Sequence, residues 1–600
     1  MKNIKEFIKS YGIYILILLC LIFGLSSLLF RNATLDDDLY LWETNIMSQA
    51  LSRGQWIGDY GVGTHGFLFK LPVALIFLLT GPSLEIATVW NVILACASLY
   101  IFYLILKKYF KKESIALGGV FLLLTSFQFF LHIPTYMREI PVVFSLLLFI
   151  YLILNKKSYW LAGLSLLLIF DAKEYVAVMI LPGIFFYILW KEKDTTFWAS
   201  VKRYLFSFIK LFLPTLVLLL LMIFTRVVPV NMYALSLVPG VTKGGIQYHL
   251  KHFDTEVSTI NRIEEDAPSI QEDIDNEQSL LSKAWGIFKS YFGKLLYPRT
   301  FSFISVPKVI VFPSIFTSIF LLKKKIKKKD FFYVFLFCIF ASFLVVFFLR
   351  ASFDRYILPI LPVIFFFYIF FLKDLVKERK KYMSVVCISA LLAGGGMFFE
   401  VDYVGIKIFL NVLIIGMYIV YLLYYKKIKN LIYYVITFVG CITFGVAAFF
   451  FVANGQIHYY MLWGKDFEIK KVISYFDENE RVLLNDVGWN MLPNVYRGDN
   501  QWSAEWKLEF SDWVPRKKYL KNFNTMNTFS MFGTSIENIK SFVDFADVGK
   551  IGLVVSNLEG YTFPYQDMLE EFKQAEWLEL DEVVSLKNKT MYIFNVIEYE

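Results

Sequence analysis

The chain has 600 residues, of which 57% are hydrophobic and 18% are charged, and its formal net charge is +9. Soluble proteins carry roughly a quarter charged residues, so this composition excludes an ordinary soluble enzyme, a disordered chain and a collagen-like chain. The lysines and arginines form short clusters between apolar runs, not one continuous basic surface for nucleic acid. We therefore expect a protein that spans a membrane and binds no nucleic acid.

The first apolar run extends from Tyr11 to Phe30 and follows three lysines, Lys2, Lys5 and Lys9. This run is longer than the apolar core of a signal peptide, and no small-residue cleavage motif follows it. We therefore expect an uncleaved anchor, with the N-terminus on the inner side of the membrane.

Apolar runs that are long enough to cross a membrane recur over the first three quarters of the chain. With the N-terminus inside, every predicted inner loop is basic, as the positive-inside rule requires. The run from Phe67 to Leu79 contains Lys70 and Pro72, and counting it as a span would place all later basic loops outside. We therefore predict a juxtamembrane or re-entrant helix there, on the outer side. About 13 spans remain, at 11–30, 87–106, 115–131, 141–154, 158–170, 175–190, 205–225, 307–322, 331–349, 357–372, 383–399, 406–425 and 431–452.

This topology places the loop 31–86, the loop 226–306 and everything after residue 452 on the outer side. Residues 254–277 of the second loop are acidic, with a single arginine. A solvated loop explains this composition, and a lid over a substrate is the alternative.

The C-terminal quarter has the composition of a water-soluble domain. Alternating apolar strings at 481–484 and 550–556 predict strands, and the segment 535–545 is typical of a helix. We therefore predict a polytopic α-helical membrane domain over residues 1–452, with its N-terminus inside, followed by an extracytoplasmic α/β domain over residues 453–600. The C-terminus then lies outside.

Ionisable residues follow several different spans at their predicted outer ends. An ionisable group at the end of or within a membrane helix is costly, so each is a functional candidate. Because all of them fall on one side, we expect them to converge over one cavity. They are Asp36, Asp37 and Asp38, then Arg138 and Glu139, then Asp171, Lys173 and Glu174, and finally Asp354 and Arg355.

Each of these candidates also has a structural explanation. The three adjacent aspartates repel one another, which raises at least one pKa and suits a general base, but they also fit a solvated loop. Lys173 and Glu174 could pair with each other. Arg355 could extend its charged end to the membrane surface. His65 and Lys70 flank the predicted helix at 67–79 and are further candidates.

Several motifs occur one after another along the segments predicted on the outer side. They are Asp37-Asp38-Leu39-Tyr40-Leu41-Trp42, His65 with the apolar stretch to Gly81, Glu139-Ile140-Pro141, Lys173-Glu174-Tyr175 through Pro182, and Arg355-Tyr356-Ile357-Leu358-Pro359 through Pro362.

Together these motifs resemble those of the GT-C membrane glycosyltransferases that use polyprenyl-phosphate sugars, the group that includes protein O-mannosyltransferases and the lipid A aminoarabinose transferase. The first resembles the family's Asp-Glu-x-Tyr-x-Trp. The second resembles His-Pro-Pro-Leu, with Gly66 and Phe67 in place of both prolines. The other three resemble the family's acid-x-Pro, Lys-Tyr…Pro and Arg-Tyr-Leu-Leu-Pro…Pro. The resemblance covers about residues 1 to 450 and leaves the C-terminal domain unmatched.

The resemblance implies an inverting transfer, in which an acceptor hydroxyl attacks the anomeric carbon of a lipid-phosphate sugar from the face opposite the phosphate. Asp37 is then the general base, a role typically worth 10²- to 10⁴-fold. Asp38 and Glu139 would orient the acceptor or hold a divalent metal ion. Cations would bind the donor phosphate as its charge grows, and the candidates are Lys173 and Arg355, with Arg138, His65 and Lys70 in addition.

The resemblance also implies a bacterial plasma (inner) membrane location, with the active site on the extracytoplasmic side. The acceptor, whether lipid, glycan or protein, is left open, as is a bound divalent metal ion. Two hypotheses from other classes are a lipid-linked sugar flippase or transporter, and a membrane-anchored receptor or scaffold whose outer domain binds a partner. A transporter would place its ionisable groups near the bilayer midplane.

Overall fold

The structure is a computed structural model, which describes most of the first 377 residues and parts of the chain from residue 472 on. His65, the loop 226–306 and the predicted spans between residues 383 and 452 lie outside the described residues. The described ranges are 2–28, 35–54, 66–155, 158–193, 196–225, 308–349, 354–377, 472–477, 480–485, 528–531, 536–556, 565–585 and 589–597.

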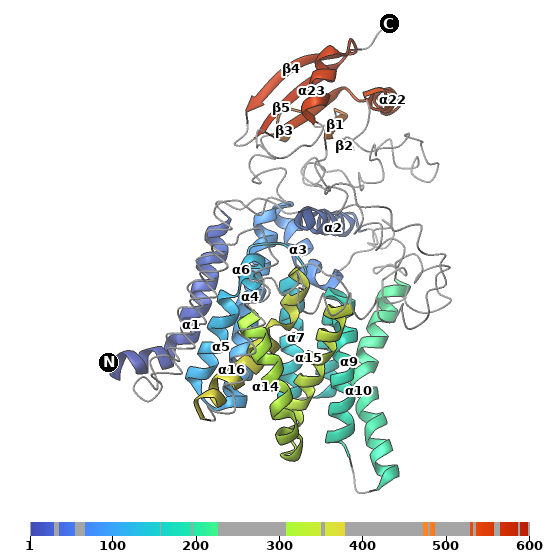
Figure 1. The fold of residues 1–600 in the computed structure, drawn as a ribbon. Coiled ribbons are helices and arrows are strands. Elements are labelled where there is room, and N and C mark those ends of the chain that lie inside the picture. The colour runs from blue at the N-terminus through green and yellow to red at the C-terminus, as the bar shows by residue number, and fades with distance from the viewer. Residues whose placement is uncertain are drawn as a thin grey trace, which may run out of the picture.

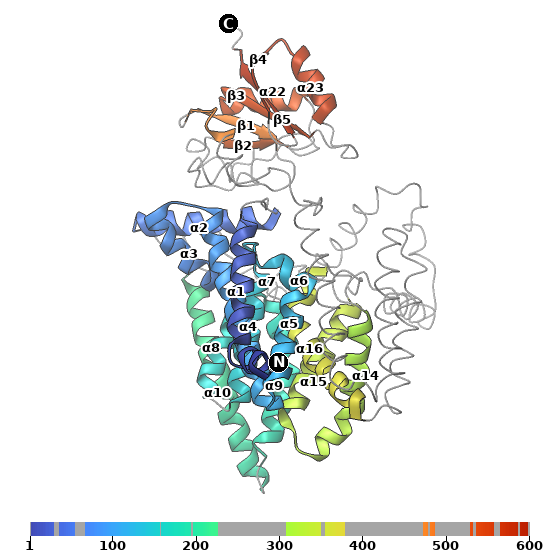
Figure 2. The ribbon, with the colours of Figure 1, turned by 90° about the vertical axis from the view of Figure 1, so that its left-hand side faces the viewer.

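Helices make up the described part of the membrane domain (Figures 1 and 2). Every predicted span that begins before residue 378 coincides with a helix, although the span 115–131 is divided at Ser126 and the last one begins with a 3-10 turn, η3. Helices follow from the apolar runs because a segment in lipid must satisfy its backbone hydrogen bonds internally. The bounds are α1 (Lys2–Ser27), α2 (Leu35–Ser52), α3 (Phe67–Thr80), α4 (Leu84–Phe110), α5 (Glu113–Thr125), α6 (Phe127–His132), α7 (Glu139–Leu154), α8 (Tyr159–Ala172), α9 (Glu174–Lys191), α10 (Phe197–Phe224), α14 (Lys308–Lys327), α15 (Phe331–Leu349), η3 (Asp354–Ile360) and α16 (Leu361–Lys377).

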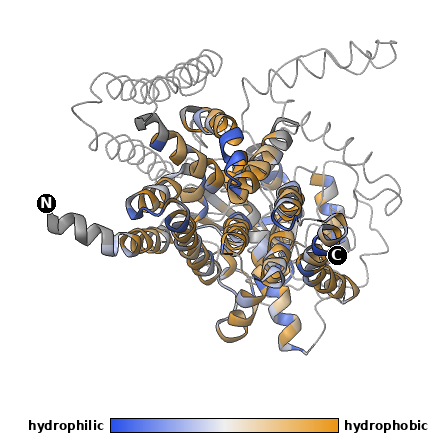
Figure 3. Cartoon of the chain, turned by 90° about the horizontal axis from the view of Figure 1, so that it is seen from below, coloured by the Kyte–Doolittle hydropathy of each residue, from blue (hydrophilic) through white to orange (hydrophobic). Residues whose placement is uncertain are grey.

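Most of the helical segments are coloured as hydrophobic in Figure 3. By length and composition, α4, α9 and α10 could each cross a membrane. Large apolar side chains such as Leu205, Phe206 and Leu221 are exposed along α10. A contiguous exposed surface of this kind suits lipid and not water. The helices therefore agree with a membrane protein, while the total number of spans and their sidedness remain predictions.

A small residue allows close approach of α8 and α10. A Cβ added to Gly163 would lie 2.2 Å from the carbonyl oxygen of Leu211. The Thr215 hydroxyl also donates to the Gly163 carbonyl oxygen at 2.8 Å. Small residues and interhelical hydrogen bonds hold helices together in lipid, where burial of apolar surface supplies little net driving force.

The predicted inner and outer loops gather at opposite ends of the bundle. At the end predicted to be the inner one, Lys108 donates to the Asn155 side chain, and the Lys325 ammonium lies 2.8 Å from the Tyr109 hydroxyl. Residues of three predicted inner loops, at 107–112, 155–157 and 323–329, therefore meet there. Asn155 follows α7, which has 16 residues and is about 24 Å long. The other end of α7 is Glu139, beside the predicted outer groups.

The C-terminal region contains a five-stranded mixed sheet with the order β2-β1-β3-β5-β4. β1 is parallel to β2 and β3, whereas β5 is antiparallel to β3 and β4. Ile551, Leu553 and Val555 alternate along β3 and share an apolar cluster with Phe542 of α22 and Phe572 of α23. The strands at the predicted positions are thus present, with one helix where it was expected. The bounds are β1 (Val482–Asn485), β2 (Thr528–Met531), α22 (Ile536–Ala546), β3 (Lys550–Ser556), α23 (Tyr565–Gln574), β4 (Leu578–Ser585) and β5 (Lys589–Val596).

The helices α2 and α3 lie at the end of the bundle that is nearest the sheet (Figures 1 and 2). They contact each other, α2 also contacts α4, and α3 contacts α8. The segment 67–79, predicted as a short helix on the outer side, is therefore a helix, and α2 lies within the predicted outer loop 31–86. These two helices bring the candidate residues together.

Candidate active site

The three aspartates belong to the first turn of α2 and not to an irregular loop. Carboxylates are stabilised near a helix N-terminus, because the helix dipole is positive there. Asp37 lies one turn before Tyr40 and Leu41, which are buried. The backbone thus places Asp37 next to the part of α2 that carries the polar contacts, while the side chains of Asp37 and Asp38 lie outside the described ones.

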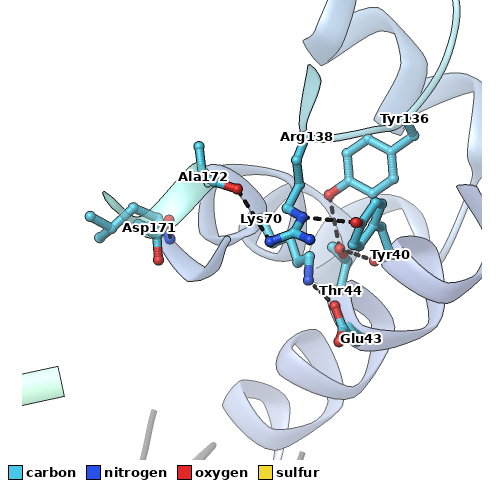
Figure 4. A network of polar contacts seen from close by, with 9 residues as sticks. Tyr40, Glu43, Thr44, Lys70, Tyr136, Arg138, Asp171 and Ala172 are labelled. Carbon is cyan, nitrogen blue, oxygen red and sulfur yellow. Dashed lines mark hydrogen bonds and ion pairs between the residues drawn. The ribbon is translucent and has the colours of Figure 1, made fainter. Parts of the chain in front are cut away.

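Lys70 of α3 is fully buried and forms an ion pair with Glu43 of α2 (Figure 4). Its ammonium nitrogen also lies 4.8 Å from the centre of the Tyr40 ring. A lysine inside an apolar helix needs such a counter-charge, because an isolated buried charge is very costly. The pair therefore fixes α3 to α2 and neutralises the charge of Lys70.

Arg138 precedes α7 and points into the same cluster (Figure 4). Its Nε donates to the Tyr40 hydroxyl at 2.7 Å, and Nη1 donates to the Ala172 carbonyl oxygen at 3.2 Å. The guanidinium carbon is 5.3 Å from the centre of the Tyr40 ring. Burial alone would lower the pKa of Arg138, but the electrostatic effects of Tyr40 and Glu174 outweigh it and raise this pKa above its ordinary value. Arg138 is therefore positively charged.

Lys173 lies between α8 and α9 and is paired with Glu139, with 2.5 Å between the ammonium nitrogen and the carboxylate oxygen. Both side chains are almost fully buried. The alternative pairing of Lys173 with Glu174 is therefore not the one that the structure shows. Lys173 adopts an extended backbone, while Glu174 begins the next helix.

The three described cations differ in how their charge is compensated. Lys70 and Lys173 each form a buried ion pair with a carboxylate. Among the described residues, Arg138 instead bonds to neutral oxygens of Tyr40 and Ala172, and it is only partly buried. A guanidinium has five N–H groups and can fork onto two oxygens of an anion. Among the described side chains, Arg138 is therefore the one of these three cations without an ion pair, although the charges of Glu174 and Glu139 act on it.

Several residues of the cluster were not assigned a role from the sequence. Tyr40, Glu43 and Thr44 follow the aspartates along α2, and the Thr44 hydroxyl lies 2.8 Å from the Tyr136 hydroxyl. Asp171 accepts a hydrogen bond from the Leu68 backbone N–H at 2.9 Å. Steps of three or four residues along α2 lead from Asp37 to Tyr40 and from Tyr40 to Glu43 and Thr44, and this helical spacing is the signal that points to them. The contact of Asp171 has no such local signal.

Arg355 belongs to η3, which contacts α6 and α7. Because α6 leads directly into the segment before Arg138, the backbone of Arg355 lies at the same end of the bundle. Its side chain lies outside the described ones. Within the described part of the chain, no three His, Cys, Asp or Glu side chains are grouped so that they could hold a metal ion.

Comparison with known proteins adds a whole-chain observation. No protein-family model matches this sequence, and no curated protein matches it in sequence. The solved structures that match it in fold include two of ArnT from Cupriavidus metallidurans. The apo state has a TM-score of 0.52 and 11% identity, and the form bound to undecaprenyl phosphate has a TM-score of 0.50 and 10% identity. The chain has the ArnT fold.

The ArnT fold extends over 97% of this chain and 98% of the solved chain. The alignment therefore includes the C-terminal region, which the motif resemblance left unmatched. The likeness to the lipid A aminoarabinose transferase that the motifs implied is thus confirmed at the level of the fold. At this identity the likeness concerns the fold alone, so the chemistry is argued from the residues.

Proposed function

We propose that this protein transfers a sugar from a polyprenyl-phosphate-linked donor to an acceptor hydroxyl, with inversion at the anomeric carbon. The supporting observation is the convergence of Lys70, Arg138 and Lys173 from three separate segments beside the acidic first turn of α2. This arrangement lies at one end of a bundle with the fold of ArnT, one structure of which holds undecaprenyl phosphate. The donor's lipid tail would lie along the apolar helices.

Arg138 is proposed as the main ligand of the donor phosphate among the described residues. A guanidinium can form two parallel hydrogen bonds to phosphate oxygens, and the hydrogen-bond partners of Arg138 among the described residues are neutral oxygens. As the bond from the sugar to the phosphate breaks, negative charge grows on the leaving phosphate, and a fixed cation stabilises it. Lys70, Lys173, Arg355 and His65 remain further candidates for this role.

Asp37 is proposed as the general base that removes the proton of the attacking hydroxyl. This role is supported by its position one turn before Tyr40, whose hydroxyl contacts Arg138, the proposed phosphate ligand. Asp38 and Glu139 are proposed to orient the acceptor. No step of this proposal passes through a divalent metal ion. The extracytoplasmic side of the plasma membrane is the proposed location.

The transporter hypothesis predicts a different location for the charged groups. It calls for ionisable residues near the middle of the membrane. The contacts of Lys70, Arg138 and Lys173 lie at the α2 and α3 end of the bundle, together with the start of α7. This placement favours an enzyme that works at one membrane face.

Binding of undecaprenyl phosphate to the purified protein in detergent tests the proposed site. Replacing Arg138 with Gln removes a charge-assisted hydrogen bond, so we expect the dissociation constant to rise by roughly 10- to 150-fold. Arg138→Lys keeps the charge but loses the fork, so its affinity should be intermediate. Undecaprenol, which has the tail without the phosphate, should bind far more weakly than undecaprenyl phosphate.

Arg481 supplies a matched control. Its Nη1 also donates to a backbone carbonyl oxygen, that of Ala546, but it lies at the sheet. Arg481→Gln should therefore leave the dissociation constant unchanged. Equal effects of Arg138→Gln and Arg481→Gln, or equal binding of undecaprenol and undecaprenyl phosphate, would argue against a phosphate site at Arg138.

A further inference from the structure

The start of α3 lacks a cap from its own chain segment. The residue before the helix is Gly66, which has no side chain, and its φ of 78° is in the left-handed region that glycine tolerates. The first N–H groups of a helix have no partner within the helix and need an acceptor from elsewhere. Asp171 supplies one, because its Oδ2 accepts from the Leu68 N–H at 2.9 Å.

Asp171 comes from the last turn of α8 and is almost completely buried. It is followed by Ala172, whose carbonyl oxygen accepts from Arg138 at 3.2 Å. Two consecutive residues of α8 therefore hold two separate parts of the cluster, the start of α3 and the guanidinium of Arg138 (Figure 4).

Gly66 also connects the cap to Arg138. A Cβ on Gly66 would lie 3.2 Å from Cδ of Arg138, so the backbone at the start of α3 lies against the arginine stem. A shift of the first turn of α3 would change the space that the Arg138 side chain occupies.

We infer that Asp171 is a positioning residue that caps α3 from α8 and so holds the start of α3 against Arg138. This inference rests on the proposed phosphate site. Asp171 acts as a hydrogen-bond acceptor for the helix end and does not touch the donor. Asparagine has an oxygen at the same position, so it preserves the cap, whereas alanine removes it.

The experiment measures undecaprenyl phosphate binding for three variants. Asp171→Ala should weaken binding by about 5- to 30-fold, the equivalent of losing a helix cap, and Asp171→Asn should restore it to within a few-fold of the wild type. Adding Asp171→Ala to Arg138→Gln should cause little further loss of binding, because the effect of Asp171 is exerted through Arg138, which is already replaced. Ser83→Ala is the matched control, because Ser83 caps α4 by accepting from Ile86 N–H and contacts none of these groups.

Hydrogen exchange at the Leu68 amide provides a readout that does not depend on the donor. Exchange should be fast in Asp171→Ala and slow in both the wild type and Asp171→Asn.

Equal losses of binding in the alanine and asparagine variants would overturn the inference, since charge and not capping would then matter. Fast exchange with unchanged binding in Asp171→Ala would also overturn it. If the alanine variant does not accumulate, a loss of binding or of Leu68 protection in Asp171→Asn overturns it, and retention of both supports it. Failure of the wild type to bind undecaprenyl phosphate would instead contradict the proposed function.

Discussion

Replacing Asp37 with Asn is expected to lower the rate of sugar transfer by about 10²- to 10⁴-fold, the usual contribution of a general base. Asparagine has nearly the same shape but cannot accept the proton of the acceptor hydroxyl. Binding of the lipid donor should persist, because the proposed phosphate ligands are cations on other segments. The measurement is the initial rate of donor consumption by the purified protein, alongside its affinity for undecaprenyl phosphate.

Asp36→Asn is the matched control for this change. It removes the same charge from the same first turn of α2. Both variants lose a favourable interaction with the helix dipole of about 0.3–1 kcal/mol, so they should be equally stable. Only the loss at Asp37 should stop the chemistry. Full activity in Asp37→Asn, or equal losses in the two variants, would remove Asp37 from the role of base.

Replacing Glu43 with Ala is expected to destabilise the protein by about 3–5 kcal/mol, because the buried ammonium of Lys70 loses its counter-charge. This is a large share of the roughly 5–15 kcal/mol that stabilises a typical domain. The effect should be visible as a lower midpoint of thermal unfolding in detergent. The exposed pair of Lys540 and Asp544 is the control, since Asp544→Ala should cost only about 0.3–0.5 kcal/mol.

The double variant Glu43→Leu with Lys70→Met separates stability from binding. Apolar residues of similar volume often replace a buried ion pair at no cost in stability. We therefore expect the thermal midpoint to return to near the wild-type value. Any loss of donor affinity that remains would then measure the contribution of Lys70 to the phosphate site. Unchanged stability in Glu43→Ala would show that the pair does not hold α2 and α3 together.

Much of the helical architecture follows from the sequence, because each apolar run has to satisfy its own backbone hydrogen bonds. The strands β1 and β3 were also readable, since their apolar residues alternate. The first turn of α2 belongs to the segment 31–86, which is predicted as an outer loop. Three adjacent acids are in fact a typical start of a helix, and the buried residues of α2 that follow lie at helical spacing.

The convergence of charged groups was predictable from topology, but their partners were not. Lys173 and Glu174 are neighbours in sequence, yet adjacent residues at a helix start do not face each other. Lys173 instead reaches Glu139 on another helix. The contact of Asp171 with Leu68 joins residues 103 positions apart, and only the packing of α3 on α8 creates it. The pairing of residues on different helices therefore determines how the charge of each cation is compensated.

Native mass spectrometry of the protein purified in mild detergent from its own membranes tests the central proposal most directly. We predict a co-purifying polyprenyl phosphate or polyprenyl-phosphate sugar, whose mass names the sugar, and we predict its loss in Arg138→Gln but not in Arg481→Gln. Ordinary phospholipids alone, bound equally by the wild type and Arg138→Gln, would contradict a donor-phosphate site at this end of the bundle.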